Sequence, residues 1–226
     1  MQHRPAVIFD VDGVLVDSYA AHFESWRRLA DERDCHKMTE TEFLETFGRT
    51  SREIIAELWP GRQWTPEEIS ALDDHKEKIF RAILRERFQA MPGAASLIDA
   101  LHRSGFALAA GSSGPPENVH LVLDQLRCRD RFDVVVTGTD VTRGKPDPEV
   151  FVTCAQRLGI PPQRSAVIED AVVGVEAANR AGMTSIALVT PPRATDMFPH
   201  ADHIARSLAE LTPEIIGAWL TRAGRA

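Results

Sequence analysis

The chain has 226 residues, of which 43% are hydrophobic and 26% charged, and its formal net charge at pH 7 is −7. This length and composition are typical of a globular protein with a substantial core, built as one domain or as one domain with an insertion. Because nucleic acids and anionic membranes require a basic protein surface, the acidic balance argues against both as partners. A phosphorylated ligand would have to be held by local cations.

The three cysteines lie far apart and form no CxxC pair, so the sequence predicts neither a disulfide framework nor a zinc site. The first residues run into an apolar segment without a hydrophobic signal region, and no apolar stretch approaches the length of a membrane span. We therefore expect a cytoplasmic protein that is a monomer or a weak homodimer.

The first apolar segment, AVIFDVDGVLV over residues 6–16, carries two aspartates, Asp10 and Asp12, next to Gly13. This pattern predicts a buried strand that ends in an acidic loop. Alternate residues of a strand point to opposite sides, so a turn at Gly13 is needed to bring both carboxylates to one site. Buried carboxylates require a cation, and oxygen ligands favour magnesium. A solvated Asp/Gly turn is the alternative interpretation of this segment alone.

Helical spacing follows over residues 17–89. Three capping boxes of the form Thr-x-x-Glu mark helix starts within it, and they begin at Thr39, Thr50 and Thr65. Gly48 is expected to end the helix before the second box. The sequence therefore predicts a small all-helical unit over residues 17–89.

Beyond Met91-Pro92-Gly93, strand-like and helix-like segments alternate. Strands are expected at 106–110, 134–137, 166–168, 185–189 and 203–204, and a final helix at 213–220. Strands separated by helices predict a doubly wound α/β fold, in which a parallel sheet is covered on both faces. We expect residues 1–16 and 90–226 to form this α/β unit, with the helical unit inserted after the first strand.

Residues suited to phosphate chemistry follow four of the predicted strands: Asp10 and Asp12, Ser112, Lys145, and Glu169 with Asp170. Because ligands bind outside the carboxyl ends of parallel strands, these side chains should converge at one edge of the sheet. Phosphoryl transfer requires such a set. A carboxylate attacks phosphorus, a metal and a lysine neutralise the oxygens, and a hydroxyl with backbone amides holds the phosphate.

The same residues lie in four ordered segments: DVDGV at 10–14, Ser112, RGKPDP at 143–148 and EDAVVG at 169–174. In this order they resemble the four motifs of the haloacid dehalogenase-like hydrolase superfamily. The helical unit resembles the cap of its branch that contains β-phosphoglucomutase-like and phosphoglycolate phosphatase-like members. The resemblance covers nearly the whole chain.

The resemblance implies that Asp10 is the nucleophile, which becomes an aspartyl phosphate, and that Asp12 is the general acid and base. Ser112 and Lys145 would bind the transferring phosphoryl group. In isolation, a helix-capping serine and a solvated loop lysine would be the default interpretations of these two residues. The superfamily also contains dehalogenases and phosphonate-cleaving enzymes, but those branches generally lack an aspartate at the position of Asp12, so phosphate-ester chemistry is favoured.

The resemblance also implies a magnesium ion held by Asp10, Asp170 and the backbone carbonyl of Asp12. Glu169 would coordinate this ion directly or through water. Mg²⁺ is thus the expected cofactor.

Substrate recognition is expected in the helical unit. On the helix that follows Thr65, Lys76 takes a position that the apolar spacing reserves for an inward-facing residue. It is either a snorkelling lysine at the edge of the apolar stripe or a lysine that faces the active site. Further candidate substrate-binding residues, which resemble cap or loop positions of the family, are His22, Trp26, Arg49, Arg52 and Ser113. His22 alone would more often be an ordinary helix histidine.

These observations predict a magnesium-dependent phosphatase that hydrolyses a small phosphomonoester, such as a sugar phosphate or phosphoglycolate, through an aspartyl phosphate. The alternative is a sugar phosphomutase of the β-phosphoglucomutase type, which shares the nucleophile. A non-catalytic sugar-phosphate-binding module would need a lost nucleophile, and Asp10 and Asp12 are both present.

Overall fold

The computed structural model describes residues 4–46, 49–59, 62–191 and 193–223. Its strands are β1 (Ala6–Phe9), β2 (Ala107–Gly111), β3 (Val134–Val136), β4 (Ser165–Glu169), β5 (Thr184–Leu188) and β6 (His203–Ala205). Its α-helices are α1 (Tyr19–Glu32), α2 (Glu40–Thr46), α3 (Ser51–Leu58), α4 (Pro66–Glu86), α5 (Ala94–Arg103), α6 (Pro116–Gln125), α7 (Glu149–Leu158), α8 (Val172–Arg180) and α9 (Pro213–Ala223). None of these described helices is both long and apolar enough to cross a membrane.

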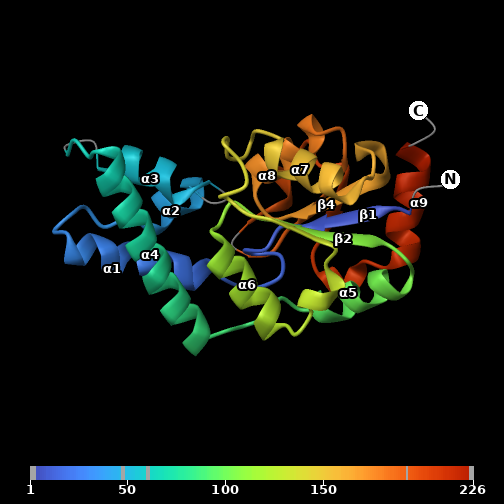
Figure 1. Ribbon diagram of the computed structural model, residues 1–226, viewed down its shortest axis with the longest axis horizontal. Coiled ribbons are helices and arrows are strands. Elements are labelled where there is room, and N and C mark those ends of the chain that lie inside the picture. Colours follow the sequence, from blue (N-terminus) through green and yellow to red (C-terminus); the bar gives the residue numbers. More distant parts are fainter. Residues whose placement is uncertain (1–3, 47–48, 60–61, 192, 224–226) are drawn as a thin grey trace.

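The strands form one parallel sheet in the order β3-β2-β1-β4-β5-β6. β1 pairs with β2 on one side and with β4 on the other, so the strand order reverses at β1. In a doubly wound sheet, this reversal is where ligands bind. The α/β fold expected from the sequence is confirmed (Figure 1).

Helices cover both faces of the sheet. Val7 and Phe9 of β1 point to the face covered by α5, α6 and α9, whereas Ile8 points to the face covered by α7 and α8. Figure 1 shows α7 and α8 on one side of the sheet and α5 and α6 on the other. Strands buried on both faces need apolar residues at every position, which explains why β1 is a continuous apolar run rather than an alternating one.

All five expected strands differ from the observed ones by one residue at one or both ends, and the last helix ends three residues later than expected. β2 begins and ends one residue later than the expected 106–110, because Gly111 still pairs with Val136. Ser112 therefore follows the strand directly. α9 reaches Ala223 instead of ending at 220, since Leu220 is still packed in the core and the last turn of a helix commonly runs past its final packed residue.

α1 to α4 pack around a hydrophobic cluster of their own, which includes Trp26, Leu29, Phe43, Ile55 and Leu72. Figure 1 shows these helices together at one end of the molecule, beyond the sheet. α3 and α4 begin with the predicted capping boxes at Thr50 and Thr65. Gly48, expected to end the preceding helix, lies outside the described residues.

The two chain segments that join the helical unit to the sheet run side by side. The backbone N–H of Asp17 donates to the carbonyl of Gln89 at 2.9 Å, and that of Met91 donates to the carbonyl of Leu15 at 3.1 Å. The two connections between the units are therefore adjacent in space.

Candidate active site

The loop after β1 places Asp10 and Asp12 at the carboxyl edge of the sheet. The N–H of Asp10 donates to the carbonyl of Ile168 in β4 at 3.0 Å, which fixes the start of the loop. Gly13 has a φ of +77°, and a Cβ at this residue would lie 1.8 Å from Oδ2 of Asp170. Both the backbone conformation and the space therefore require glycine in the motif.

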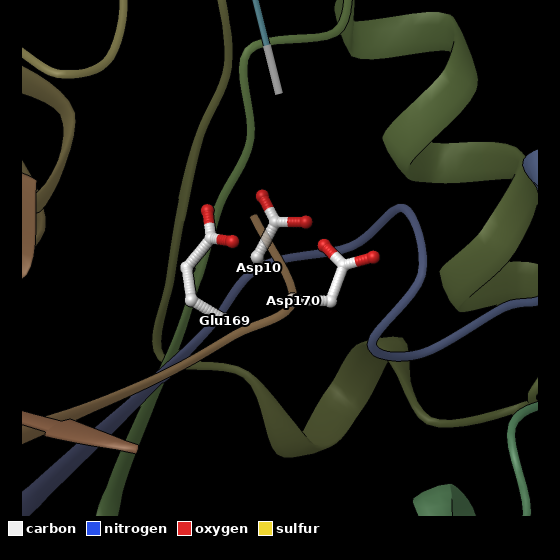
Figure 2. A group of neighbouring side chains, drawn as sticks. All are labelled: Asp10, Glu169 and Asp170. Atoms are coloured by element: carbon white, nitrogen blue, oxygen red, sulfur yellow. The ribbon is translucent and has the colours of Figure 1, made fainter. Parts of the chain in front are cut away.

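Three carboxylates converge at this edge: Asp10, Glu169 and Asp170 (Figure 2). One oxygen of each lies within 4.8 Å of the others, and all three residues are buried. Glu169 is the last residue of β4, and its Oε2 accepts a hydrogen bond from the N–H of Ala171 at 2.8 Å. A Cβ at Gly174 would lie 1.9 Å from Oε1 of Glu169, so the glycine of the EDAVVG segment makes room for this carboxylate.

Burial and mutual repulsion raise the pKa of two of these carboxyl groups, Asp10 and Asp170. Burial is the largest cause that raises the pKa of Asp10 well above its ordinary value, and the charges of Glu169, Asp170 and Asp12 add to it. Burial likewise raises the pKa of Asp170 to about 7, although Arg193 acts in the opposite direction. A cation relieves such repulsion, and three buried carboxylates with oxygen donors fit a hard divalent ion such as Mg²⁺.

Lys145 connects the nucleophile candidate to the acidic cluster. Its Nζ lies 2.5 Å from Oδ1 of Asp10 and 2.5 Å from Oε1 of Glu169, and only 1% of its side chain is exposed. Burial acts to lower the pKa of Lys145, but the two carboxylates outweigh it and raise the pKa above its ordinary value. Lys145 is therefore a buried ammonium ion, not a solvated loop lysine.

Ser112 is also buried, at the end of β2. Its Oγ accepts a hydrogen bond from the N–H of Gly114 at 3.0 Å, which shapes the loop before α6. The residue at the N-cap of α6 is Pro115. The helix-cap interpretation of Ser112 is therefore wrong, and its hydroxyl belongs to the loop that faces Asp10 and Asp12.

Arg193 lies after β5 and was not predicted as a site residue. Its guanidinium NH2 is 2.7 Å from Oδ2 of Asp170, and only 6% of its side chain is exposed. An isolated arginine after two prolines carries no sequence signal for this contact, because its position depends on how the segment after β5 folds back over the sheet edge.

Asp12 faces the helical unit, away from Lys145. Its Oδ1 lies 3.2 Å from Nε2 of His22 on α1. Burial acts to raise the pKa of Asp12, but the adjacent imidazole of His22, together with Ser18, outweighs it and lowers the pKa below the ordinary value. The two aspartates of this loop thus have pKa values that are shifted in opposite directions, and the lowered pKa of Asp12 favours its ionised form, which can accept a proton.

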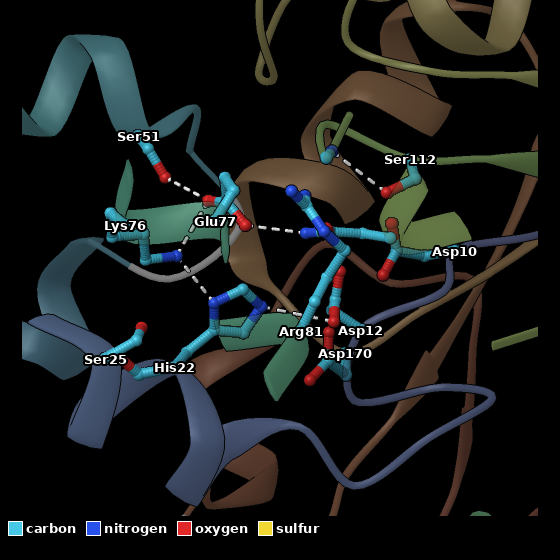
Figure 3. Close-up of polar contacts among 12 residues, drawn as sticks. Asp10, Asp12, His22, Ser25, Ser51, Lys76, Glu77, Arg81, Ser112 and Asp170 are labelled. Atoms are coloured by element: carbon cyan, nitrogen blue, oxygen red, sulfur yellow. Dashed lines mark hydrogen bonds and ion pairs between the residues drawn. The ribbon is translucent and has the colours of Figure 1, made fainter. Parts of the chain in front are cut away.

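Lys76 is buried in the helical unit, with 1% of its side chain exposed. Its Nζ lies 2.8 Å from Nδ1 of His22 and 2.8 Å from Oε1 of Glu77, as Figure 3 shows. The ammonium group also lies 5.1 Å from the ring centre of Trp26. Lys76 therefore points inward, and the snorkelling interpretation is wrong. Glu77, its neighbour on α4, was not anticipated.

Arg49 and Arg52 line the cavity from the helical unit and are already paired. Arg49 donates two hydrogen bonds to Glu57, at 2.9 and 2.6 Å. Arg52 donates from Nε to Oδ2 of Asp73 at 2.8 Å, and 59% of its side chain is exposed. Both arginines form their contacts within the helical unit.

A cavity of about 320 Å³ lies between the helical unit and the sheet edge. Of the twelve predicted site residues, eleven line it: Asp10, Asp12, His22, Trp26, Arg49, Arg52, Lys76, Ser112, Ser113, Lys145 and Asp170. Glu169 does not line the cavity and contacts Lys145 behind it. The structure thus brings residues from both units to one cavity.

The chain is similar to known proteins of one family. Residues 7–188 match the family model described as haloacid dehalogenase-like hydrolase. The phosphorylated carbohydrates phosphatase of Thermotoga maritima is 33% identical over 80% of this chain and 83% of its own length. The β-phosphoglucomutase of Bacillus subtilis is 29% identical over 93% of each chain.

A solved structure shows the same fold. The β-phosphoglucomutase structure from Clostridium difficile superposes with a TM-score of 0.88 at 24% identity, covering 99% of this chain and 100% of the other. Since the family model covers most of the chain, including the segments that carry Asp10, Ser112, Lys145 and Asp170, the chain belongs to the haloacid dehalogenase-like hydrolase family.

Proposed function

We propose that this protein is a magnesium-dependent phosphatase that hydrolyses a small sugar phosphate or a similar phosphomonoester through an aspartyl phosphate on Asp10. The observation that carries the proposal is that the two aspartates of the loop after β1 contact different partners. Asp10 lies against Lys145, whereas Asp12 lies against His22 across the cavity. A relative named a phosphorylated carbohydrates phosphatase supports a phosphoric monoester hydrolase and a sugar phosphate as substrate.

Asp10, Asp170 and the backbone carbonyl of Asp12 would hold the magnesium ion, with Glu169 as a direct or water-mediated ligand. When bound, the ion would neutralise the non-bridging oxygens of the phosphoryl group. Lys145 would neutralise the same oxygens, and the position of its ammonium group beside Asp10 supports this role. The Ser112 hydroxyl and the N–H groups of its loop would hold the phosphoryl group in line with Asp10.

In the first step, a carboxylate oxygen of Asp10 attacks phosphorus, the bond to the leaving oxygen breaks, and Asp12 donates a proton to that oxygen. In the second step, Asp12 takes a proton from water as the water oxygen attacks phosphorus. The bond to Asp10 then breaks and inorganic phosphate leaves. Asp12 is thus the general acid in one step and the general base in the next.

The pairing of the arginines favours hydrolysis over the mutase reaction. In a mutase, the phosphoryl group on Asp10 returns to another hydroxyl of the bound sugar phosphate, so a bisphosphate forms with one phosphate at the far end of the cavity. Arg49 and Arg52 would each have to give up a carboxylate, Glu57 or Asp73, to hold that phosphate. Water as the acceptor requires no second phosphate at these arginines, which can then contact uncharged hydroxyl groups of the substrate while they keep their carboxylate partners.

We further propose that residues 17–89 act as a cap that closes on the substrate and hinges at the paired connections near Asp17 and Gln89. His22, Trp26, Arg49, Arg52 and Lys76 of this cap, with Ser113 of the sheet edge, would contact the part of the substrate that does not react. Closure would exclude bulk water while the aspartyl phosphate exists.

The test is phosphate release from a panel of phosphomonoesters that includes sugar phosphates, polyol phosphates and phosphoglycolate, run beside an assay for sugar-phosphate isomerisation. We expect phosphate release from a sugar or polyol phosphate and no isomerisation. Isomerisation that exceeds phosphate release would favour the mutase. Failure to release phosphate from any of these esters, with magnesium present, would contradict the proposal.

A further inference from the structure

A buried carboxylate outside the catalytic set, Glu77 on α4, links the helical unit to the sheet. Only 5% of Glu77 is exposed. Its Oε1 accepts hydrogen bonds from Lys76 Nζ at 2.8 Å and from Ser51 Oγ at 2.7 Å, both within the helical unit. Its Oε2 accepts a hydrogen bond from Nδ2 of Asn118 at 2.6 Å, and Asn118 lies on α6 beside the sheet. Glu77 therefore accepts hydrogen bonds from two donors in the helical unit and from one donor outside it, Asn118.

Asn118 contacts α4 at two places. Its Nδ2 donates to Glu77, and its Oδ1 accepts from NH1 of Arg81 at 2.9 Å. Residues 77 and 81 are neighbours one turn apart on the same helix face. The chemistry of the partners fixes the orientation of the amide, because a guanidinium only donates and an ionised carboxylate only accepts. The buried side-chain amide of Asn118, which is 2% exposed, therefore hydrogen-bonds two residues that lie one turn apart on α4.

The same contacts continue to Asp12 (Figure 3). The ammonium group of Lys76 lies between Glu77 and Nδ1 of His22. Since an ammonium group only donates, Nδ1 must accept, and the ring proton of a neutral His22 must lie on Nε2, which faces Oδ1 of Asp12. The imidazole also stacks on Phe80 with ring centres 3.8 Å apart, which limits its rotation.

The chain of contacts begins at Asn118 beside the sheet, crosses the helical unit and returns to the sheet edge at Asp12. It is complete only while α4 is docked on α6. Withdrawal of the helical unit would remove one donor from Glu77 and both of these partners from Asn118. While α4 stays docked, a substitution that removes one partner leaves a buried polar group that no water can pair, which makes such a substitution costly.

From this geometry, we propose that Glu77 and Asn118 are positioning residues that latch α4 onto α6 and, through Lys76, fix the tautomer and ring orientation of His22 toward Asp12. The inference rests on the proposed function for the statement that Asp12 transfers the proton. The latch and the tautomer are properties of the folded protein and do not depend on turnover.

The first experiment is NMR of protein labelled with ¹⁵N-histidine, with the His22 signals assigned by their loss in His22→Asn. In the unsubstituted protein we expect the Nε2–H tautomer, with Nδ1 as an acceptor. Asn118→Ala and Glu77→Gln should each weaken that preference. The control is Glu117→Gln, a substitution at an exposed residue next to Asn118 on α6, which should leave the signals unchanged. An unaltered His22 tautomer in both latch variants would overturn the proposal.

The second experiment is a double-mutant cycle. Asn118→Ala should lower kcat for the best sugar phosphate on the order of tenfold, because His22 would no longer be held in its orientation toward Asp12. The loss should be smaller on an aryl phosphate, whose leaving oxygen needs little protonation. In Asn118→Ala combined with His22→Ala, the loss should be no greater than the larger single loss. Fully multiplicative losses would show that Asn118 does not act through His22 and would overturn the proposal.

Two further variants separate the contacts of Asn118. Asn118→Asp keeps an acceptor for Arg81 but removes the donor to Glu77, whereas Arg81→Met removes only the other contact. We expect Asn118→Asp to change the His22 tautomer more than Arg81→Met does. A larger change in Arg81→Met would contradict the proposal that Asn118 acts on His22 through Glu77 and Lys76. Glu77→Gln serves if Asn118→Ala does not fold. If the unsubstituted protein hydrolyses no phosphomonoester, the proposed function fails, and the NMR result still decides the latch.

Discussion

Arg193 and Asp170 form a buried ion pair at the carboxyl edge of the sheet, with the guanidinium NH2 2.7 Å from Oδ2. Arg193 is thus a second cation, besides Lys145, that compensates the acidic cluster. The pair explains how this cluster can be packed together when no metal is bound. It also means that the residue after the two prolines matters to the proposed metal site, although the four motifs do not include it.

Arg193→Met should destabilise the metal-free protein, because Asp170 would remain buried without this cation. Removing one partner of a buried pair typically costs about 3 kcal/mol in the free energy of unfolding. Magnesium should restore more stability to the variant than it adds to the unsubstituted protein. Thermal unfolding with and without magnesium measures both effects. An equal magnesium-induced shift in the two proteins would show that Arg193 does not compensate the metal site.

Removal of the metal should abolish phosphate release, and addition of magnesium should restore it. The physical reason is the crowding of Asp10, Glu169 and Asp170, whose oxygens lie within 4.8 Å of one another. A substrate phosphate would add further negative charge to this cluster. Activity is measured in excess chelator and again after magnesium is returned. Full activity in the chelator would exclude the proposed cofactor.

The stability of the protein should depend on the ionisation of Glu77. Burial acts to raise the pKa of Glu77, but Lys76 and the other partners outweigh it and lower the pKa from 4.5 to about 2. A carboxyl whose pKa is lowered on folding stabilises the protein above its unfolded pKa, and that stability is lost as the pH falls toward the folded value. The shift corresponds to about 3 kcal/mol in the free energy of unfolding.

Glu77→Gln should therefore be less stable than the unsubstituted protein at pH 7, and the difference should shrink as the pH falls from about 5 to about 2. Chemical unfolding across this pH range provides the measurement. Glu117→Gln is the matched control and should leave the acid dependence unchanged. A constant difference between Glu77→Gln and the unsubstituted protein at all pH values would contradict the lowered pKa.

Arg52→Ala should raise KM for the preferred substrate and leave turnover of an aryl phosphate nearly unchanged, because Arg52 lines the cavity from the helical unit, where its ion pair is with Asp73. Loss of a charge-assisted contact typically costs about 1.5–3 kcal/mol. Lys76→Ala should lower kcat as well, since Lys76 contacts His22. Equal losses on both substrates in Arg52→Ala would place this residue in the catalytic machinery.

The fold and the sheet-edge set follow closely from the sequence. Strand ends that carry charged residues converge in a parallel sheet, so the alternation of strands and helices is enough to predict that Asp10, Lys145 and Asp170 meet. Gly13 and Gly174 belong to the motifs, but the reason for them is visible only in three dimensions, where each leaves space for a carboxylate.

Contacts between distant elements could not be predicted from spacing. The apolar stripe of α4 identified Lys76, but Glu77 next to it is buried where α4 meets Ser51 of α3 and Asn118 of α6. Asn118 and Arg193 have no local pattern that marks them, since their partners are 41 residues away in one case and follow a different strand in the other. Such residues are defined by the docking of whole elements rather than by sequence periodicity.

The account depends most on Asp10 as the residue that carries the phosphoryl group. Asp10→Asn should lower phosphate release by about 10³-fold or more while circular dichroism shows an intact fold. The most direct measurement is rapid quenching of the unsubstituted enzyme during turnover of its best substrate, followed by peptide mass spectrometry. We predict a phosphoryl group on Asp10 that is absent in Asp10→Asn. Undiminished turnover in Asp10→Asn, or a phosphoryl group on another residue, would contradict the account.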